Sequence, residues 1–287
     1  MASIRIGVVG DLHTHWDDID VAQFGRSDYD LLFFIGDLGG GTADSSLRIA
    51  RSIARLDKET LVMPGNNDTG DITELSAELS HRMGLSRIAA MRNGADTKAP
   101  IRLCGYSSHR ITRDSVDLTL ITARPHSMGG ESLSFPEQLS MNYGIDSIDA
   151  SIERMCALID ESETERLVFF SHNGPTGLGA APDDMWGCDF KPGGGDWGDP
   201  DLEVAISHAV AAGKQVLAVV AGHMHLRTKH GAERAWITER AGIAYVNTAR
   251  VPRIFATDDD VHRHHVSLVV TAEGIEISEV LVPQQAG

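Results

Sequence analysis

The chain is poor in cysteine, and this shortage excludes two classes of protein. Its 287 residues contain only three cysteines, at positions 104, 156 and 188. Their number is odd and their spacing is wide, which fits neither a disulfide framework nor a zinc site built from paired cysteines. We therefore expect reduced thiols in a cytoplasmic protein.

Basic residues are also few. The 25 lysines and arginines are outnumbered by 41 aspartates and glutamates, which gives a formal net charge of −16. A nucleic-acid polymer or an anionic membrane surface would be repelled by this charge, so we expect neither as a partner. A small anionic substrate is not excluded, because it responds to a local field that bound cations can reverse.

Long apolar runs are absent from the sequence. No run approaches the roughly 20 residues that span a bilayer, and the amino terminus lacks the apolar core and cleavage site of a signal peptide. Hydrophobic residues still make up 42% of the chain, enough to bury a substantial core. We predict one α/β domain over residues 1–287 and no membrane association.

The clearest local pattern lies at residues 31–40, LLFFIGDLGG, where a continuous apolar run is followed by Asp37 on a glycine-rich turn. The run is too short for a globular helix and is typical of a parallel strand that is covered on both faces. Asp37 is therefore expected at the carboxyl end of a strand. Ligands bind at this edge in open α/β sheets.

The same arrangement, an apolar strand followed by polar side chains able to bind metals, occurs four more times. Further strands are predicted over 4–9, 61–63, 167–170 and 215–221, and the side chains that follow them are Asp11 and His13, Asn66, His172, and His223 with His225. Ligands on alternate positions face the same side where the chain is extended. Other predicted elements are strands at 101–106, 118–122 and 244–247, helices at 45–57, 146–164 and 203–212, and a helix with a loop at 72–92.

Each of these polar residues has an ordinary structural interpretation as a turn former, a helix cap or a satisfied histidine. That interpretation would have to hold five times at the same topological position. Two carboxylates, four imidazoles and an amide form a ligand set suited to Mn²⁺, Fe or Zn²⁺ rather than to Ca²⁺ or a soft metal. Seven groups exceed the needs of one ion with an open position, so we predict two divalent metal ions.

Three other segments carry predictions. Loop 123–130, ARPHSMGG, contains Arg124, whose guanidinium suits bidentate phosphate binding, although a solvated surface arginine is an equal alternative. Residues 174–200 form a long irregular loop that is expected to line the site entrance. A carboxyl-terminal hairpin is predicted over 265–282, and the nearby histidines His262, His264 and His265 are expected on a solvated face.

The ordered polar motifs resemble those of one known family. The calcineurin-like metallophosphoesterases have five motifs, which are matched in order by Asp11-Leu12-His13, Gly36-Asp37, Gly65-Asn66-Asn67-Asp68, Ser171-His172 and Gly222-His223-Met224-His225. The resemblance implies a four-layer αββα sandwich of two mixed β-sheets flanked by helices, with the site at the strand ends. Loop 123–130 and the segment GGGDWGDPDL are similar to a cyanobacterial and plastid branch of that superfamily.

The resemblance also implies roles for the ligands. One metal ion would be held by Asp11, His13, Asp37 and His225, and the other by Asp37, Asn66, His172 and His223. Two such ions, most simply Mn²⁺, would share Asp37 and a bridging hydroxide that attacks phosphorus in line. We therefore predict a phosphodiesterase or a small-molecule phosphatase acting on a phosphorylated small molecule. Arg124 and Asn66 would contact the substrate.

One position departs from the family pattern. Asn67 stands where many relatives have a histidine that resembles a general acid, oriented by the following acidic residue, here Asp68. An amide cannot deliver a proton near neutral pH. The alternatives are a substrate with a good leaving group, an acid supplied by His126 or His15, or a catalytically weak metal-binding scaffold. A Ser/Thr-type protein phosphatase is less favoured, because that branch typically carries the sequence GNHE.

Overall fold

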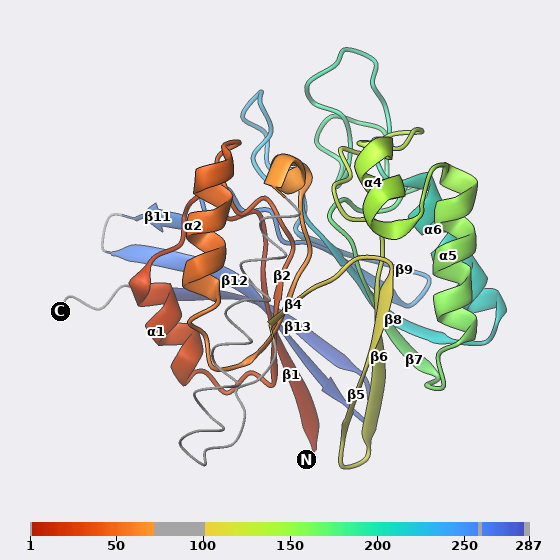
Figure 1. The fold of residues 1–287 in the computed structure, drawn as a ribbon, viewed down its shortest axis with the longest axis horizontal. Coiled ribbons are helices and arrows are strands. Elements are labelled where there is room, and N and C mark those ends of the chain that lie inside the picture. Colours follow the sequence, from red (N-terminus) through yellow and green to blue (C-terminus); the bar gives the residue numbers. More distant parts are fainter. Residues whose placement is uncertain (1, 72–100, 258–259, 284–287) are drawn as a thin grey trace.

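Two mixed β-sheets lie face to face between two pairs of helices (Figure 1). This architecture is that of a computed structural model, which describes residues 2–71, 101–257 and 260–283. The predicted four-layer αββα sandwich is confirmed. The helix and loop predicted over 72–92 lie outside the described residues.

The first sheet contains the strands that open the chain and those that close it. Its order is β11-β12-β1-β2-β3-β4, with β13 paired to β12. The strands are β1 (Ser3–Val9), β2 (Leu31–Phe34), β3 (Glu59–Val62), β4 (Ile101–Leu103), β11 (Ile254–Ala256), β12 (Val261–Thr271) and β13 (Ile275–Pro283). The strands from β1 to β4 are parallel, and β12 is antiparallel to β1, β11 and β13.

The second sheet has a parallel centre and antiparallel edges, in the order β5-β6-β7-β8-β10-β9. Its strands are β5 (Ser107–Arg113), β6 (Val116–Thr122), β7 (Arg166–Phe170), β8 (Gln215–Ala221), β9 (Ile237–Arg240) and β10 (Ile243–Asn247). The central strands are continuous apolar runs because both of their faces are covered. The parallel strands of both sheets end at one edge of the molecule, towards the top of Figure 1.

Aromatic packing joins the two sheets. Phe33 on β2 and Phe170 on β7 are fully buried, and their rings stack with centroids 3.9 Å apart and planes 12° apart. Buried aliphatic residues of β1, β6, β8 and β12 surround this pair. The packing fixes how close the loops of one sheet come to the loops of the other.

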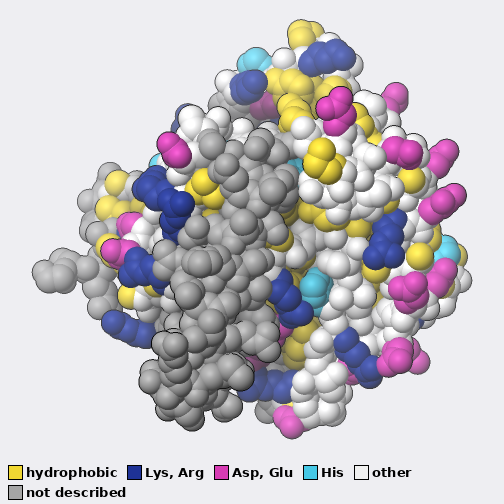
Figure 2. Space-filling view, in the orientation of Figure 1, with side chains coloured by type: hydrophobic (Ala, Val, Ile, Leu, Met, Phe, Trp, Pro, Cys, Tyr) yellow, Lys and Arg dark blue, Asp and Glu magenta, His cyan; other side chains and the backbone are white. Residues whose placement is uncertain are grey.

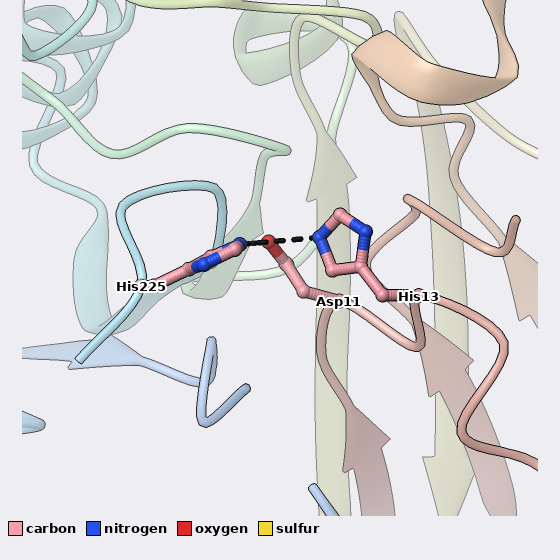
Figure 3. A group of neighbouring side chains, drawn as sticks. All are labelled: Asp11, His13 and His225. Atoms are coloured by element: carbon pink, nitrogen blue, oxygen red, sulfur yellow. Dashed lines mark hydrogen bonds and ion pairs between the residues drawn. The ribbon is translucent and has the colours of Figure 1, made fainter. Parts of the chain in front are cut away.

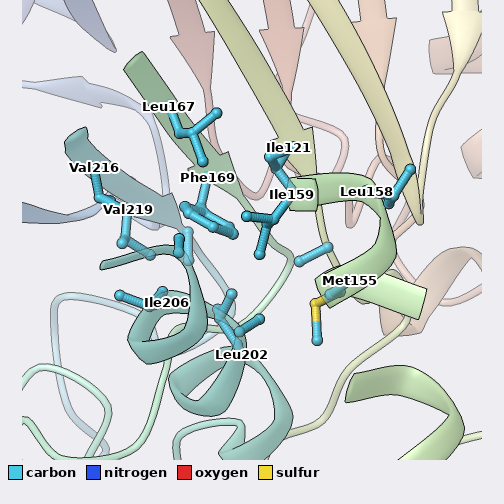
Figure 4. Packing of buried hydrophobic residues seen from close by; sticks show 14 of the residues in the cluster. Ile121, Met155, Leu158, Ile159, Leu167, Phe169, Leu202, Ile206, Val216 and Val219 are labelled. Carbon is cyan, nitrogen blue, oxygen red and sulfur yellow. The ribbon is translucent and has the colours of Figure 1, made fainter. Parts of the chain in front are cut away.

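Amphipathic helices cover the outer faces. Helices α1 (Asp18–Arg26) and α2 (Ala43–Ile53) cover the first sheet, and α5 (Ile148–Asp160) and α6 (Pro200–Ala211) cover the second. Figure 4 shows Met155 and Ile159 of α5 and Leu202 and Ile206 of α6 gathered around Phe169 of β7. The short elements α4 (Pro136–Tyr143) and η1 (Asn66–Asp71) lie near the carboxyl edge of the strands. Among the described residues, no helix is long and apolar enough to cross a membrane.

The sequence prediction does not include α4, β5, β9 and β11, and it differs from the structure at β4 and α1 as well. The strand predicted over 101–106 is divided, because Gly105 (φ 155°) and Tyr106 (φ 46°) turn the chain from β4 in the first sheet to β5 in the second. The sequence does not predict helix α1, because its apolar residues recur only weakly at helical spacing. A capping box of Asp17 and Asp20 begins it, and the buried Asp20 carboxylate binds Arg253 at 3.0 Å.

The solvated face predicted for the histidines near the carboxyl terminus is wrong for His264 and His265, which are 2% and 5% exposed. Strand β12 lies inside the sheet rather than at its edge, so its side chains are covered. His264 Nε2 lies 3.0 Å from a carboxylate oxygen of Glu279, and His265 Nε2 lies 2.8 Å from the Tyr29 hydroxyl.

Burial of His265 predicts sensitivity to acid. Burial lowers the pKa of His265 to about 3, so below pH 6.5 the unfolded chain binds a proton that the folded chain does not. The free energy of unfolding should then fall by up to about 1.4 kcal/mol for each pH unit below 6.5. Chemical denaturation between pH 4 and 7 measures this slope. His265→Gln should make the slope shallower by that amount, whereas His262→Gln, at a half-buried position, should leave it unchanged. Equal slopes in the two variants would contradict the assignment.

Candidate metal centre

Five loops at the carboxyl edge of the strands bring all seven predicted ligands together. Asp11 and His13 follow β1, Asp37 follows β2 and Asn66 follows β3, while the second sheet supplies His172 after β7 and His223 with His225 after β8. Two groups form: Asp11 with His13 and His225, and Asp37 with His172 and His223. Within each group the potential ligand atoms lie within 4.8 Å of one another.

The first group joins the two sheets. In Figure 3 the side chains of Asp11, His13 and His225 point towards one another. His13 Nε2 lies 3.1 Å from His225 Nε2, and His225 Nε2 lies 3.8 Å from Asp11 Oδ2. Three donor atoms therefore converge on one point from loops separated by more than 200 residues of sequence.

The second group is arranged around His172. The Nδ1–H of His172 donates to the Ile35 carbonyl at 2.7 Å, which leaves the lone pair on Nε2, as is usual for a metal-binding histidine. That Nε2 lies 3.0 Å from Asn66 Oδ1 and 3.6 Å from Asp37 Oδ1. The other oxygen of Asp37 lies 3.5 Å from His13 Nε2 in the first group. Asp37 thus lies between the two groups, with one oxygen towards each.

Backbone strain is concentrated at the ligands. Asp11, His13, Asp37 and His223 have φ values of 26°, 41°, 48° and 65°, in the left-handed region that residues with a side chain rarely adopt. Each such residue costs on the order of 1 kcal/mol and persists only where its surroundings enforce it. Two hydrogen bonds do so here: the His13 N–H donates to the Asp37 carbonyl at 2.8 Å, and the His223 N–H donates to the Asp11 carboxylate at 3.0 Å.

Two glycines of the motifs leave room for the carboxylates. A Cβ atom at Gly65 would lie 2.2 Å from Asp37 Oδ1, and one at Gly222 would lie 2.3 Å from Asp11 Oδ1. Any side chain at either position would displace a ligand. These glycines are therefore required by close approach.

The electrostatics of the site favour a bound cation. Burial raises the pKa of Asp11. Burial acts in the same direction on Asp37, but His172 and His13 outweigh it and hold the Asp37 pKa below its usual value. Burial lowers the pKa of His223 to about 3, so its imidazole is neutral. Burial lowers the pKa of His172, but Asp37 and Asp11 outweigh it and raise that pKa, which shows that the two buried carboxylates call for a positive charge nearby. Divalent ions would supply that charge. The donor set therefore fits metal ions.

Asn67 and Asp68, which stand at the position of the family's general acid and its orienting residue, make structural contacts. Asn67 donates its backbone N–H to Asp37 Oδ1 at 2.9 Å and its side-chain amide to Asp37 Oδ2 at 2.7 Å. Asp68 is fully buried and accepts from Ser46 Oγ and from the N–H groups of Leu38 and Gly65. Asp68 therefore braces the loops after β2 and β3, and Asn67 orients Asp37. The orienting role that the resemblance implies for Asp68 is not matched by these hydrogen bonds.

The contacts in the structure do not support two further predicted roles. Arg124 is not a solvated surface arginine, because its guanidinium is fully buried, and it lies 2.7 Å from Asp199 and 3.2 Å from Asp201 rather than among the residues that line the cleft. His126 is fully buried, and its Nδ1–H donates to the Gly65 carbonyl at 3.0 Å. Burial lowers the pKa of His126 to about 4, so it carries no proton to deliver near neutral pH.

A cleft of about 330 Å³ opens beside the ligands. Its walls include His13, Asp37, Asn66, Asn67, Met128, Asp189, Phe190, His223, His225, Arg227, Lys229 and Arg234. Two of these residues, Asp189 and Phe190, belong to loop 174–200. His15, the other histidine considered as an acid, is half-buried and is not among the residues that line the cleft.

Sequence reasoning missed Arg234, which supports the metal centre. Its guanidinium is 3% exposed and donates to the carbonyls of His225, Gly187 and Pro182, each at 2.8 Å. These bonds hold loop 174–200 against the loop that carries His225. Nothing in the local sequence around position 234 indicates this role, because the acceptors come from distant segments.

The buried ion pairs of Arg124 predict a structural phenotype. Arg124→Gln would leave Asp199 and Asp201 buried without their cation, and it should lower the free energy of unfolding by about 3 to 5 kcal/mol. Chemical denaturation measures the loss, and Arg26→Gln, at an exposed position at the end of α1, is the matched control. Unchanged stability together with weaker substrate binding would instead support the original phosphate-binding role.

Comparison with known proteins places this geometry in a family. Residues 4–227 match the family model described as calcineurin-like phosphoesterase, whereas no curated protein matches the sequence. One solved crystal structure has a TM-score of 0.58 at 12% identity and covers 97% of this chain and 99% of its own.

Two further solved structures are more distant. A metallophosphoesterase from Sphaerobacter thermophilus has a TM-score of 0.31 at 10% identity and covers 96% of this chain and 88% of its own. Vacuolar Protein Sorting 29 from Cryptosporidium parvum has a TM-score of 0.32 at 8% identity and covers 99% and 100%. The family model spans most of the chain and includes all seven ligands, and the protein therefore belongs to the calcineurin-like phosphoesterase family.

Proposed function

We propose that this protein hydrolyses small phosphoesters at a centre of two divalent metal ions, most simply Mn²⁺. The observation that carries the proposal is the position of Asp37, whose two carboxylate oxygens lie 3.6 Å and 3.5 Å from histidines of different ligand groups. A carboxylate placed in this way can bridge two ions. When bound, such a pair supplies an activated water and neutralises the charge of the phosphoryl oxygens.

The seven ligands divide between the two ions. One ion would be bound by Asp11, His13, Asp37 and His225, and the other by Asp37, Asn66, His172 and His223. The hydrogen bond from His172 to the Ile35 carbonyl orients that ring, and Asn67 holds both oxygens of Asp37. These contacts would position the ligands before any ion binds, which reduces the cost of ordering them.

The substrate follows from what surrounds the ligands. A cleft of about 330 Å³ suits a small molecule. Asn67 cannot donate a catalytic proton, and buried His126 is neutral, so we propose a substrate whose leaving group departs without one. Aryl phosphates and aryl phosphodiesters meet this condition, because a phenolate is a weak enough base to leave unprotonated. The retention of all seven ligands and the strained backbone at four of them favour an enzyme over a metal-binding scaffold.

The three cysteines support a location in a reducing compartment. All three are free thiols, and Cys104 and Cys188 are buried. We propose the cytoplasm, where thiols remain reduced.

The function is tested by activity and metal content together. Purified protein supplied with Mn²⁺ should hydrolyse bis-p-nitrophenyl phosphate faster than p-nitrophenyl phosphate, and metal analysis should find two ions per chain. Removing the charge of the bridging carboxylate in Asp37→Asn should lower kcat by about 10³-fold or more, because charge stabilisation of this kind is worth several kcal/mol.

The control for folding is Asp44→Asn, an exposed carboxylate on α2, which should change neither metal content nor rate. Two bound ions without turnover of either ester would support the scaffold instead. Failure to bind metal would contradict the proposal altogether.

A further inference from the structure

The segment after β8 continues past the metal ligands in a regular alternation. From position 223 to position 229, the cleft is lined by Met224 and by four residues with accessible side chains at alternate positions: His223, His225, Arg227 and Lys229. The residues between them, Met224, Leu226 and Thr228, are buried at 4%, 2% and 6% exposure. Two cations therefore follow two metal ligands along one wall of the cleft.

These cations lie close to the ligands. Two residues span at most about 7 Å, so the Arg227 Cα lies within about 7 Å of the His225 Cα. Arg227 forms an isolated antiparallel bridge with Glu233, flanked by hydrogen bonds from the Arg234 N–H to the Leu226 carbonyl at 2.7 Å and from the Thr228 N–H to the Ala232 carbonyl at 2.9 Å. The two cations and the two histidines line the same cleft, so a ligand held at the metal centre can reach both cations.

Neither cation is neutralised within the parts of the chain that the structure describes. There, no carboxylate forms an ion pair with the side chain of Arg227 or Lys229. The Lys229 ammonium lies 5.3 Å from the centre of the Phe190 ring, a cation–π contact that leaves its charge available. Two accessible, uncompensated cations beside the centre are notable in a chain of net charge −16.

The support for these cations is rigid. Asp189, which precedes Phe190, accepts from the Lys229 backbone N–H at 2.7 Å, and its other oxygen lies 3.4 Å from the buried Arg234 guanidinium. Arg234 also donates to the His225 carbonyl. Asp189 and Arg234 thus link loop 174–200 to the backbone at Lys229 and at His225.

Figure 2 shows basic, histidine and apolar side chains at the upper end of the molecule, with acidic side chains among them and more along the right-hand flank. The net charge of the chain is −16, so any attraction for an anion must come from a local site.

We propose that Arg227 and Lys229 form a binding site for a second phosphate group of the substrate, with the phosphoester to be cleaved held at the metal centre. This proposal rests on the proposed function and narrows it to phosphoesters that carry a further phosphate. A guanidinium can bind phosphate through two parallel hydrogen bonds, and the neighbouring ammonium supplies the second charge that a phosphate dianion requires. Phe190 sets the position of that ammonium.

The test compares two nucleotides that differ only in the second phosphate. Titration calorimetry with Mn²⁺ present should show thymidine 3′,5′-bisphosphate binding at least about tenfold more tightly than thymidine 5′-monophosphate, since charged hydrogen bonds carry the difference. In the double variant Arg227→Ala/Lys229→Ala the ratio of the two affinities should fall to near one. The double variant Arg26→Ala/Arg55→Ala removes two exposed cations that do not line the cleft and should keep the ratio.

Hydrolysis of bis-p-nitrophenyl phosphate by the wild-type protein separates the two proposals. Turnover of this ester with equal affinity for the two nucleotides would overturn the second-phosphate site and leave the proposed function intact. A tenfold preference for the bisphosphate that disappears in Arg227→Ala/Lys229→Ala would support the second-phosphate site. This holds even if the ester is not hydrolysed, a result that would overturn the proposed function. If the double variant Arg227→Ala/Lys229→Ala keeps the preference for the bisphosphate, the second-phosphate site is overturned, whether or not the ester is hydrolysed.

Discussion

The position of the Asp37 carboxylate is the constraint on which the rest of the site depends. It must lie between two groups of ligands that are contributed by loops of both sheets, and the packing of the sheets fixes this arrangement. Phe33 and Phe170, whose rings stack across the core, are followed within four residues by Asp37 and His172. A core contact thus determines a distance in the metal centre, so repacking the core would move ligands before it unfolded the chain.

The site is strained, and buried polar contacts hold it in place. Four ligands adopt left-handed backbone conformations, and the fully buried Asp68 connects the loops after β2 and β3. Burial and the neighbouring Asp37 raise the pKa of Asp68 to about 6, so its ionisation costs free energy in the fold. Bound cations would offset that repulsion, and ion binding and loop order are therefore coupled. The loops that carry the ligands therefore order together rather than one residue at a time.

Much of this could be predicted from the sequence, because the strands are continuous apolar runs and each ends in a ligand. The sandwich and the convergence of the seven ligands follow from that repetition. Burial of charged side chains could not be predicted, since it depends on partners from distant segments: Arg124 looked accessible in a glycine-rich loop but lies between Asp199 and Asp201. The burial of His264 and His265 on β12 was not predicted for the same reason. Alternation of residue types along a strand indicates which side chains share a face, but not which other elements cover that face.

The most direct test of the account is crystallographic. Crystals of the protein grown with Mn²⁺ should give two anomalous difference peaks about 3.5 to 4 Å apart, with Asp37 bound to both. Asn67 should still contact the Asp37 carboxylate in that structure. A single peak, or two peaks that do not share Asp37, would contradict the bridging role on which the proposed chemistry depends.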